Sequence, residues 1–110
     1  MKPGDKCQLL KIYVSEDSKY KGHNLYSAVV YKLKESGIAG VTVTRAIEGY
    51  GKGKAIHSAR ILDLSSSLPI IIEAIDTVEQ IEKVLPALSG MVNEGMIFVT
   101  DVNVIKYGKE

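Results

Sequence analysis

The sequence predicts an α+β fold of the ferredoxin-like type, a four-stranded antiparallel sheet with two helices on one face. Strand and helix patterns follow one another in the order β-α-β, a long loop, then β-α-β. Each half needs a right-handed crossover, and two halves that share one sheet form the split β-α-β sandwich. The 110 residues are enough for one core, so a single domain over residues 1–110 is expected, with 1–6 flexible.

The first strand is expected from Gln8 to Val14. Leu10, Ile12 and Val14 alternate there with more polar residues, which is the period of a half-buried strand. Cys7, just before it, is interpreted as a small core residue.

The first helix is predicted from apolar residues at helical spacing, namely Leu25, Ala28, Val29 and Leu33. Asn24 is its expected N-cap, and Gly37 stands where a left-handed residue would end it. His23 is interpreted as the residue that leads into this helix. The stretch Val41 to Thr44 then gives a second strand that runs out at Gly49.

The stretch 49–67 shows neither period and is predicted to be a long functional loop, because structureless connections of this length are uncommon inside a compact domain. It opens with Gly49-Tyr50-Gly51-Lys52-Gly53-Lys54. Such glycines let backbone N–H groups converge, and lysines add positive charge, so the segment suits an anion the size of phosphate. The alternative is a plain loop whose glycines only allow a sharp exit from the strand.

The second half of the chain repeats the pattern. A strand is expected from Ile70 to Ile75, with Pro69 at its first position. A helix follows with Val78, Ile81, Val84, Leu85 and Leu88 on one face, and Pro86 should kink it or end its regular part. Asp76 is its expected N-cap, with Glu79 completing a capping box. The last strand is predicted from Met96 to Ile105.

The composition excludes several classes of function. Fourteen Lys and Arg against thirteen Asp and Glu give a formal charge of +1, which provides no field for nucleic acid or an anionic membrane. One Cys and two His fall short of a metal site, and a lone Cys fits a reducing, cytoplasmic setting. No apolar run is long enough for a signal peptide or a membrane span. His57 has no partner nucleophile and acid at a recognisable spacing, so no catalytic residue and no enzyme activity are predicted.

Apolar residues occupy both faces of the predicted sheet, including Leu9, Tyr13, Ile71 and Ile75. Helices cover only one of these faces, and an exposed apolar face of this size is normally covered by a partner. We therefore expect a homo-oligomer. Asp101 and Asn103, unusual in so apolar a strand, are expected to bond across a subunit contact or at a sheet edge.

Four short motifs in this order resemble the trimeric P-II-type nitrogen-regulatory signal proteins. They are Val41–Thr44 leading to Gly49–Lys52, then Leu68–Glu73, Glu94–Val99 and Asp101–Val102. From about Leu9 to Gly108 the chain is most similar to a P-II-like subfamily of bacteria and archaea.

The resemblance implies a homotrimer whose open sheet faces line the centre. It also implies that an adenine nucleotide, AMP, ADP or ATP, binds in clefts between subunits, and that no other cofactor is required. The nucleotide-binding residues implied by position are Thr44, Gly49, Tyr50, Gly51, Lys52, Asn93, Glu94, Gly95 and, from the neighbouring chain, Lys106. The loop would correspond to the segment that docks onto a target, such as a membrane transporter or a metabolic enzyme, with Lys54, His57 and Arg60 in contact with that partner.

The chain departs from the family pattern in its charges. Met96 stands where the family has a phosphate-contacting lysine, and the paired C-terminal arginines are reduced to Lys106 and Lys109. A charge-assisted hydrogen bond contributes about 1.5–3 kcal/mol, so losing one costs one or two orders of magnitude in triphosphate affinity, and AMP or ADP fits as well as ATP. Two alternatives stay open: a ligand-independent trimeric interaction module, and a metal-responsive protein like the divalent-cation tolerance family.

Overall fold

The computed structural model describes residues 1–2, 4–51, 57–58 and 67–108, the pair 57–58 by its backbone alone. Its main elements are β1 (Cys7–Ser15), α1 (Leu25–Glu35), β4 (Val41–Arg45), β7 (Pro69–Thr77), α2 (Val78–Met91) and β8 (Met96–Val102). Two short ladders pair β2 (Lys19–Tyr20) with β3 (His23–Asn24) and β5 (Glu48–Gly49) with β6 (His57–Ser58). Within these ranges neither helix has the length and apolar character needed to cross a membrane.

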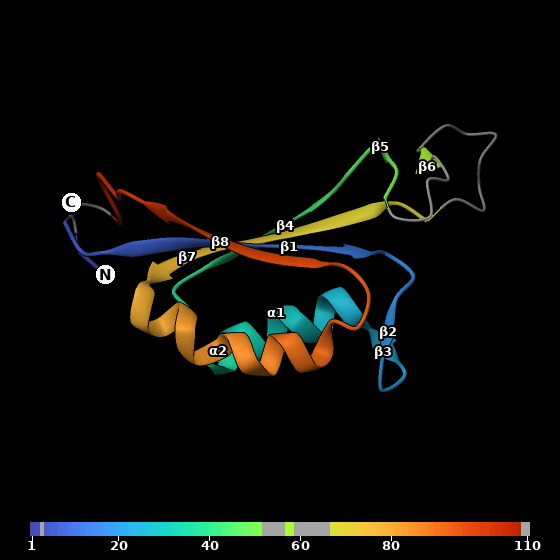
Figure 1. Cartoon of the computed structure of the whole chain (residues 1–110), viewed down its shortest axis with the longest axis horizontal. Helices are drawn as coiled ribbons and strands as arrows, with labels where there is room; N and C mark the ends of the chain where they lie inside the picture. The colour runs from blue at the N-terminus through green and yellow to red at the C-terminus, as the bar shows by residue number, and fades with distance from the viewer. Residues whose placement is uncertain (3, 52–56, 59–66, 109–110) are drawn as a thin grey trace.

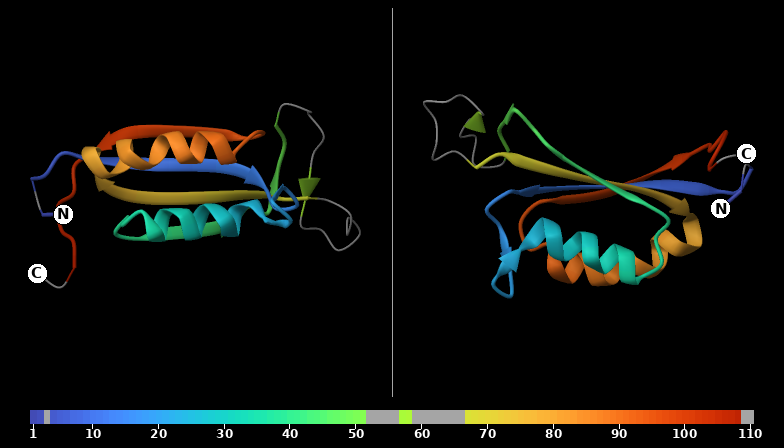
Figure 2. Two further views of the ribbon diagram at one scale, coloured as in Figure 1. Left: turned by 90° about the horizontal axis from the view of Figure 1, so that it is seen from below. Right: turned by 180° about the vertical axis from the view of Figure 1, so that it is seen from behind.

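The sheet has the strand order β4-β7-β1-β8, and every neighbouring pair is antiparallel. Both helices lie against the same face of this sheet, as the three views agree (Figures 1 and 2). The predicted ferredoxin-like α+β sandwich is therefore confirmed.

The core lies between the helices and the sheet face that they cover. Leu10 and Ile12 of β1 are fully buried, and Ile72 of β7 is 1% exposed. The helices contribute Val29, Leu33, Ile81 and Leu88, which are also fully buried. Burying one such side chain stabilises the fold by about 1.5–3 kcal/mol, so the alternation of β1 and the helical spacing of α1 and α2 together determine which faces meet. Cys7 is buried too, as predicted.

The sheet face without helices is apolar over much of its area. Register places Leu9, Lys11 and Tyr13 of β1 beside Ile75, Glu73 and Ile71 of β7. On the other side of β1, Met96 and Phe98 of β8 pair with Tyr13 and Lys11. The rings of Tyr13 and Phe98 stack with centroids 6.1 Å apart, and Phe98 is still 38% exposed. A Lys11–Glu73 ion pair of 3.9 Å is the charged feature of this face. We call this surface the open sheet face.

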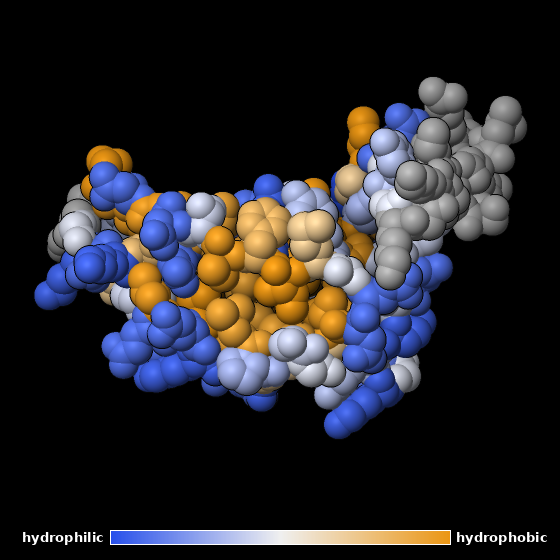
Figure 3. All heavy atoms as spheres, in the orientation of Figure 1, coloured by the Kyte–Doolittle hydropathy of each residue, from blue (hydrophilic) through white to orange (hydrophobic). Residues whose placement is uncertain are grey.

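Strand β8 forms one edge of the sheet and pairs with β1 on its inner side. Figure 3 shows an apolar surface over the middle of the molecule on this side, where β8 and α2 meet. Val99 of β8 is 36% exposed although it pairs with the fully buried Leu10. Asp101 accepts a hydrogen bond of 3.3 Å from Gln8 Nε2 on β1. This bond joins β8 to its neighbour β1 at the edge of the sheet, and a contact of Asp101 across a subunit interface stays a prediction.

The last strand ends earlier than predicted, at Val102 instead of Ile105. The cause is its partner, because Val102 pairs with Cys7, the first residue of β1. The second strand also ends early, at Arg45, since β7 begins at Pro69 and offers only one more carbonyl, which accepts from the Ala46 amide at 2.9 Å.

The predicted caps are correct at one helix and wrong at the other. Gly37 has φ of +86° just after α1, as expected, although the Asn24 side chain makes no capping bond. Thr77, not Asp76, caps α2 by accepting from the Gln80 amide at 3.3 Å. Asp76 is 5% exposed, and its carboxylate accepts a hydrogen bond of 2.9 Å from the amide of Ala39, which lies 37 residues away in the sequence. Helix α2 also continues beyond Pro86 to Met91.

Candidate functional site

Most described candidate residues lie at one end of the sheet. Here β4 ends at Arg45, which pairs with Ile70, and β1 ends at Ser15, which pairs with Pro69. The start of β8 reaches the same end, since Met96 pairs with Tyr13. We call this the loop end of the sheet. The structure therefore brings the exit into the 49–67 loop and the turn before β8 to the same end.

Two strands, β7 and β1, separate Thr44 at the end of β4 from Gly95 at the start of β8. With strands about 4.8 Å apart, the two residues are roughly 14 Å apart across the sheet. One chain thus presents two groups of candidate residues at this end, one on each side of the central strands, which we call the candidate half-sites.

The first half-site is the beginning of the loop. Glu48 and Gly49 pair with β6, and a Cβ built on Gly49 would lie 3.1 Å from Cγ of Pro69. Tyr50 is 68% exposed, and Gly51 is exposed as well. The predicted loop is thus not wholly irregular, because it contains the β5–β6 ladder. Lys52, Lys54 and Arg60 lie outside the described residues, as does the side chain of His57.

The second half-site is the turn Asn93–Gly95. Asn93, Glu94 and Gly95 are all exposed, and one side of the Gly95 backbone faces β1. Gly95 has φ of +149°, and a Cβ built on it would lie 2.3 Å from the carbonyl oxygen of Tyr13. A glycine is required here because any side chain would collide with the backbone of β1, so this close approach fixes the position of the turn beside β1. Met96 follows it and is 58% exposed.

Lys106 does not join these residues within one chain. It is exposed and follows β8, which runs from the loop end to the opposite end of the sheet. Figure 1 shows the red segment that follows β8 there, far from β5.

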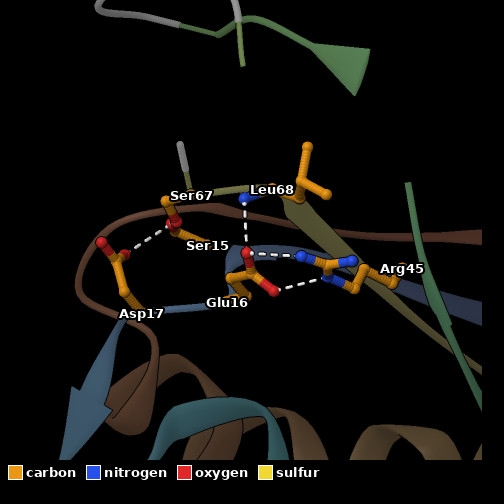
Figure 4. Close-up of polar contacts among 6 residues, drawn as sticks. All are labelled: Ser15, Glu16, Asp17, Arg45, Ser67 and Leu68. Atoms are coloured by element: carbon orange, nitrogen blue, oxygen red, sulfur yellow. Dashed lines mark hydrogen bonds and ion pairs between the residues drawn. The ribbon is translucent and has the colours of Figure 1, made fainter. Parts of the chain in front are cut away.

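A polar cluster that sequence reasoning missed joins the strands at the loop end (Figure 4). The Glu16 carboxylate, just after β1, accepts from Arg45 Nε at 2.6 Å and from Arg45 Nη2 at 3.1 Å. It also accepts from the Leu68 amide at 3.1 Å. The hydroxyls of Ser15 and Ser67 bond to each other beside it. Arg45 and Leu68 are 29 and 52 residues from Glu16, so no local spacing could have indicated the cluster.

These contacts shift the acid–base balance of both partners. The hydrogen bonds from Arg45, and then that from the Leu68 amide, lower the pKa of Glu16 below its ordinary value of 4.5. The bond to Glu16 in turn raises the pKa of Arg45. Each ion is stabilised by the other, which keeps the pair charged at neutral pH.

A pH dependence follows from the lowered pKa of Glu16. A carboxyl group with a lowered folded-state pKa stabilises the fold above its unfolded pKa, and this contribution is lost as the pH falls through the lowered value. At pH 7 we expect Glu16→Gln to melt no more than a few degrees below the wild type, because the pair is partly exposed. The difference should begin to shrink as the pH falls below 4.5 and should vanish once the pH lies below the lowered pKa of Glu16. A difference that keeps its full size throughout an acid titration of the melting midpoint would contradict an ionic origin.

Comparison with known proteins places the chain in a family. Residues 7–104 match the model of the DUF190 family, described as "Uncharacterized ACR, COG1993". The chain belongs to the DUF190 family. A UPF0166 protein of Aquifex aeolicus (strain VF5) is 43% identical to this DUF190 protein over 100 residues, which cover 91% of this chain and 94% of the relative. UPF0166 protein MJ1524 of Methanocaldococcus jannaschii is 41% identical over 102 residues, 92% of this chain and 94% of the relative.

Solved structures share the fold of this DUF190 protein. CPII of Thiomonas intermedia K12, bound to ADP and bicarbonate, superposes with a TM-score of 0.68 at 19% identity, covering 92% of this chain and 90% of CPII. A second CPII structure, described as a nitrogen regulatory PII-like protein bound to ADP, AMP and bicarbonate, gives 0.69 at 18% identity with the same coverage. CutA of Synechococcus elongatus PCC7942 gives 0.56 at 17% identity, covering 94% of this chain and 81% of CutA. The PII-like fold expected from the four motifs is confirmed.

Proposed function

We propose that this DUF190 protein is a PII-like regulatory protein, a homotrimer that binds an adenine nucleotide between subunits and controls a partner protein through its 49–67 loop. The observation that carries the proposal is the fold shared with CPII, whose structures hold ADP, in one case with AMP. It is a binding and signalling function, without catalysis as its main task.

The arrangement of the half-sites supports an intersubunit site. Thr44 to Gly51 and the turn Asn93–Gly95 occupy the loop end, whereas Lys106 lies at the opposite end of the same sheet. A nucleotide that contacts both ends of the sheet therefore needs Lys106 from another copy of the chain. Phosphate binding would draw on the Gly49–Lys52 segment, as the glycine and lysine pattern indicates.

The apolar surfaces of the fold support the oligomer. The open sheet face exposes Ile75 and Phe98 at 39% and 38%, and Met96 at 58%. Contiguous apolar area on this scale is normally covered in solution. A ring of three copies would cover the open sheet faces at its centre and leave the helices outside.

The nucleotide should act on the loop by differential affinity, because a ligand that binds two loop states equally shifts neither. The target of the loop is an unknown protein, for example a membrane transporter or a metabolic enzyme. Lys54, His57 and Arg60 are the proposed contacts, and a cytoplasmic setting fits a chain with one buried cysteine.

The first experiment is a thermal-shift panel of AMP, ADP and ATP on the purified protein. A ligand at 100 times its Kd adds about 2.7 kcal/mol to the native state, which raises the melting midpoint by roughly ten degrees. Calorimetry should then show that Lys52→Ala weakens binding about tenfold or more, since it removes one charge-assisted contact. The matched control is Lys83→Ala, which changes an exposed lysine on α2 that pairs with Glu79 at 3.8 Å.

Two results would count against the proposal. If no adenine nucleotide shifts the midpoint although the protein is trimeric, the ligand-independent interaction module becomes the better reading. If Lys52→Ala and Lys83→Ala bind alike, the beginning of the loop is not part of the site. Among the described residues, no three His, Cys, Asp or Glu gather at one place that could hold a metal ion. The metal-responsive alternative would be supported by a metal titration that shows binding.

A further inference from the structure

Three hydrogen-bond donors at the loop end converge on one anion, the Glu16 carboxylate. Two come from the guanidinium of Arg45, Nε at 2.6 Å and Nη2 at 3.1 Å. The third is the Leu68 amide at 3.1 Å, which shares the oxygen Oε1 with Nη2 (Figure 4). The Leu68 amide is held in place because its own carbonyl accepts from the Glu16 amide at 2.9 Å.

This donor set suits oxyanions in general. A guanidinium presents parallel N–H groups that match carboxylate and phosphate oxygens alike, and a backbone amide adds a fixed third donor. The Glu16 carboxylate therefore occupies a position in which a phosphate group would find the same donors. Solvent reaches the cluster, since the side chains of Arg45 and Glu16 are 57% and 24% exposed.

The cluster also lies where the proposed ligand is short of positive charge. Arg45 directly follows Thr44 on β4, and Glu16 follows β1, so the ion pair spans β7 between the two half-sites. Met96, at the start of β8, supplies no charge at this end of the sheet. Arg45 supplies a guanidinium at the same end of the sheet, on the face of β4 opposite to that of Thr44.

We propose that Arg45 and the Leu68 amide form an oxyanion subsite that the Glu16 carboxylate fills in the unliganded protein, and that a phosphate group of the ligand displaces Glu16 from it. The inference rests on the proposed function and deepens it. Glu16 is then an internal competitor that lowers the affinity for phosphate-bearing ligands. Because Leu68 and Arg45 flank the 49–67 segment, displacement of Glu16 changes the bonding on both sides of the loop.

Titration calorimetry of four probes tests the exchange: ADP, inorganic pyrophosphate, bicarbonate and adenosine, the last of which carries no oxyanion. Glu16→Gln keeps the shape and an oxygen for the Leu68 amide but removes the competing charge. It should bind ADP and pyrophosphate about tenfold tighter than the wild type. Arg45→Gln should bind both about tenfold more weakly than the wild type. The affinity of Arg45→Lys should lie between those of Arg45→Gln and the wild type, because lysine keeps the positive charge but lacks the paired N–H donors of a guanidinium.

Adenosine affinity should be the same in all these proteins. The double variant Glu16→Gln/Arg45→Gln should lose the gain of Glu16→Gln, which separates a lost competitor from a general rise in affinity. The matched control is Glu35→Gln, which removes a 3.0 Å ion pair with Lys32 on α1. A gain for bicarbonate without a gain for pyrophosphate would overturn the assignment to phosphate.

The inference and the proposed function fail in different ways. If the wild type binds ADP and neither Arg45→Gln nor Glu16→Gln changes the affinity, the subsite is wrong and the nucleotide function stands. If the wild type binds no adenine compound but Glu16→Gln binds pyrophosphate through Arg45, the subsite stands and the nucleotide function falls. Equal behaviour of Glu16→Gln and Glu35→Gln towards pyrophosphate overturns the inference directly.

Discussion

Gly95→Ala is expected to lower the free energy of unfolding by about 3 kcal/mol or more, a large part of the 5–15 kcal/mol of a typical domain. The new Cβ would lie 2.3 Å from the Tyr13 carbonyl oxygen and 3.2 Å from Cγ1 of Val92. The first of these atoms belongs to the backbone of β1, so it cannot turn away as a side chain can. The φ of +149° adds strain of its own for any residue with a side chain.

Urea unfolding measures this effect, and Gly90→Ala is the matched control. Gly90 is exposed near the end of α2, and a Cβ there would meet no atom within 4 Å. Alanine at a helical position is favoured over glycine by about 0.5–1 kcal/mol, so this variant should be slightly more stable than the wild type. If Gly95→Ala unfolds at the same urea concentration as the wild type, the turn does not pack on β1 as described.

The elements that the sequence predicted best are those with a sustained period. The alternation around Leu10 and Ile12 and the helical spacing around Val29 and Ile81 are local patterns, and both match the buried faces of the structure. The β2–β3 hairpin was missed because strands of two residues are too short to show a period. Lys21 and Gly22 make its turn with φ of +48° and +83°, a pattern that the Lys-Gly pair only weakly indicates.

Features set by distant partners could not be read from the sequence. Asp76 has the residue type of a helix cap, yet the Ala39 amide takes its carboxylate and Thr77 caps α2 instead. The end of β8 depends on where β1 begins. The Glu16 cluster needs the folded sheet to bring Arg45 and Leu68 together. The candidate site residues came from the glycine and lysine pattern of the loop and from motif resemblance, and the structure places the described ones at two ends of one sheet.

Phe98→Glu is expected to convert the proposed trimer into monomers. Phe98 stacks on Tyr13 in the open sheet face, close to the Lys11–Glu73 pair. In a trimer with these faces at its centre, three new carboxylates would lose water near one axis and repel one another. Each new carboxylate would face Lys11, whose ammonium already pairs with Glu73, so every subunit would bury one excess negative charge. Such a charge costs several kcal/mol at each subunit, which is more than a contact of this kind can offset.

Light scattering or sedimentation measures the mass directly. The wild type should appear at about 36 kDa, three times the 12.0 kDa of one chain, and Phe98→Glu at about 12 kDa. The matched control is Tyr31→Glu, the same change at a residue of α1 that is 70% exposed on the opposite side of the domain. It should remain trimeric.

The same pair of variants also tests how binding depends on assembly. If the nucleotide needs Lys106 from a second chain, monomeric Phe98→Glu should lose the ADP-dependent rise in melting temperature, and Tyr31→Glu should keep it. A Phe98→Glu protein that is monomeric, folded and still stabilised by ADP would place the whole site within one chain. A Phe98→Glu protein that stays trimeric would instead show that the open sheet face is not the contact, and the exposed apolar edge at β8 and α2 would then be the surface to change next.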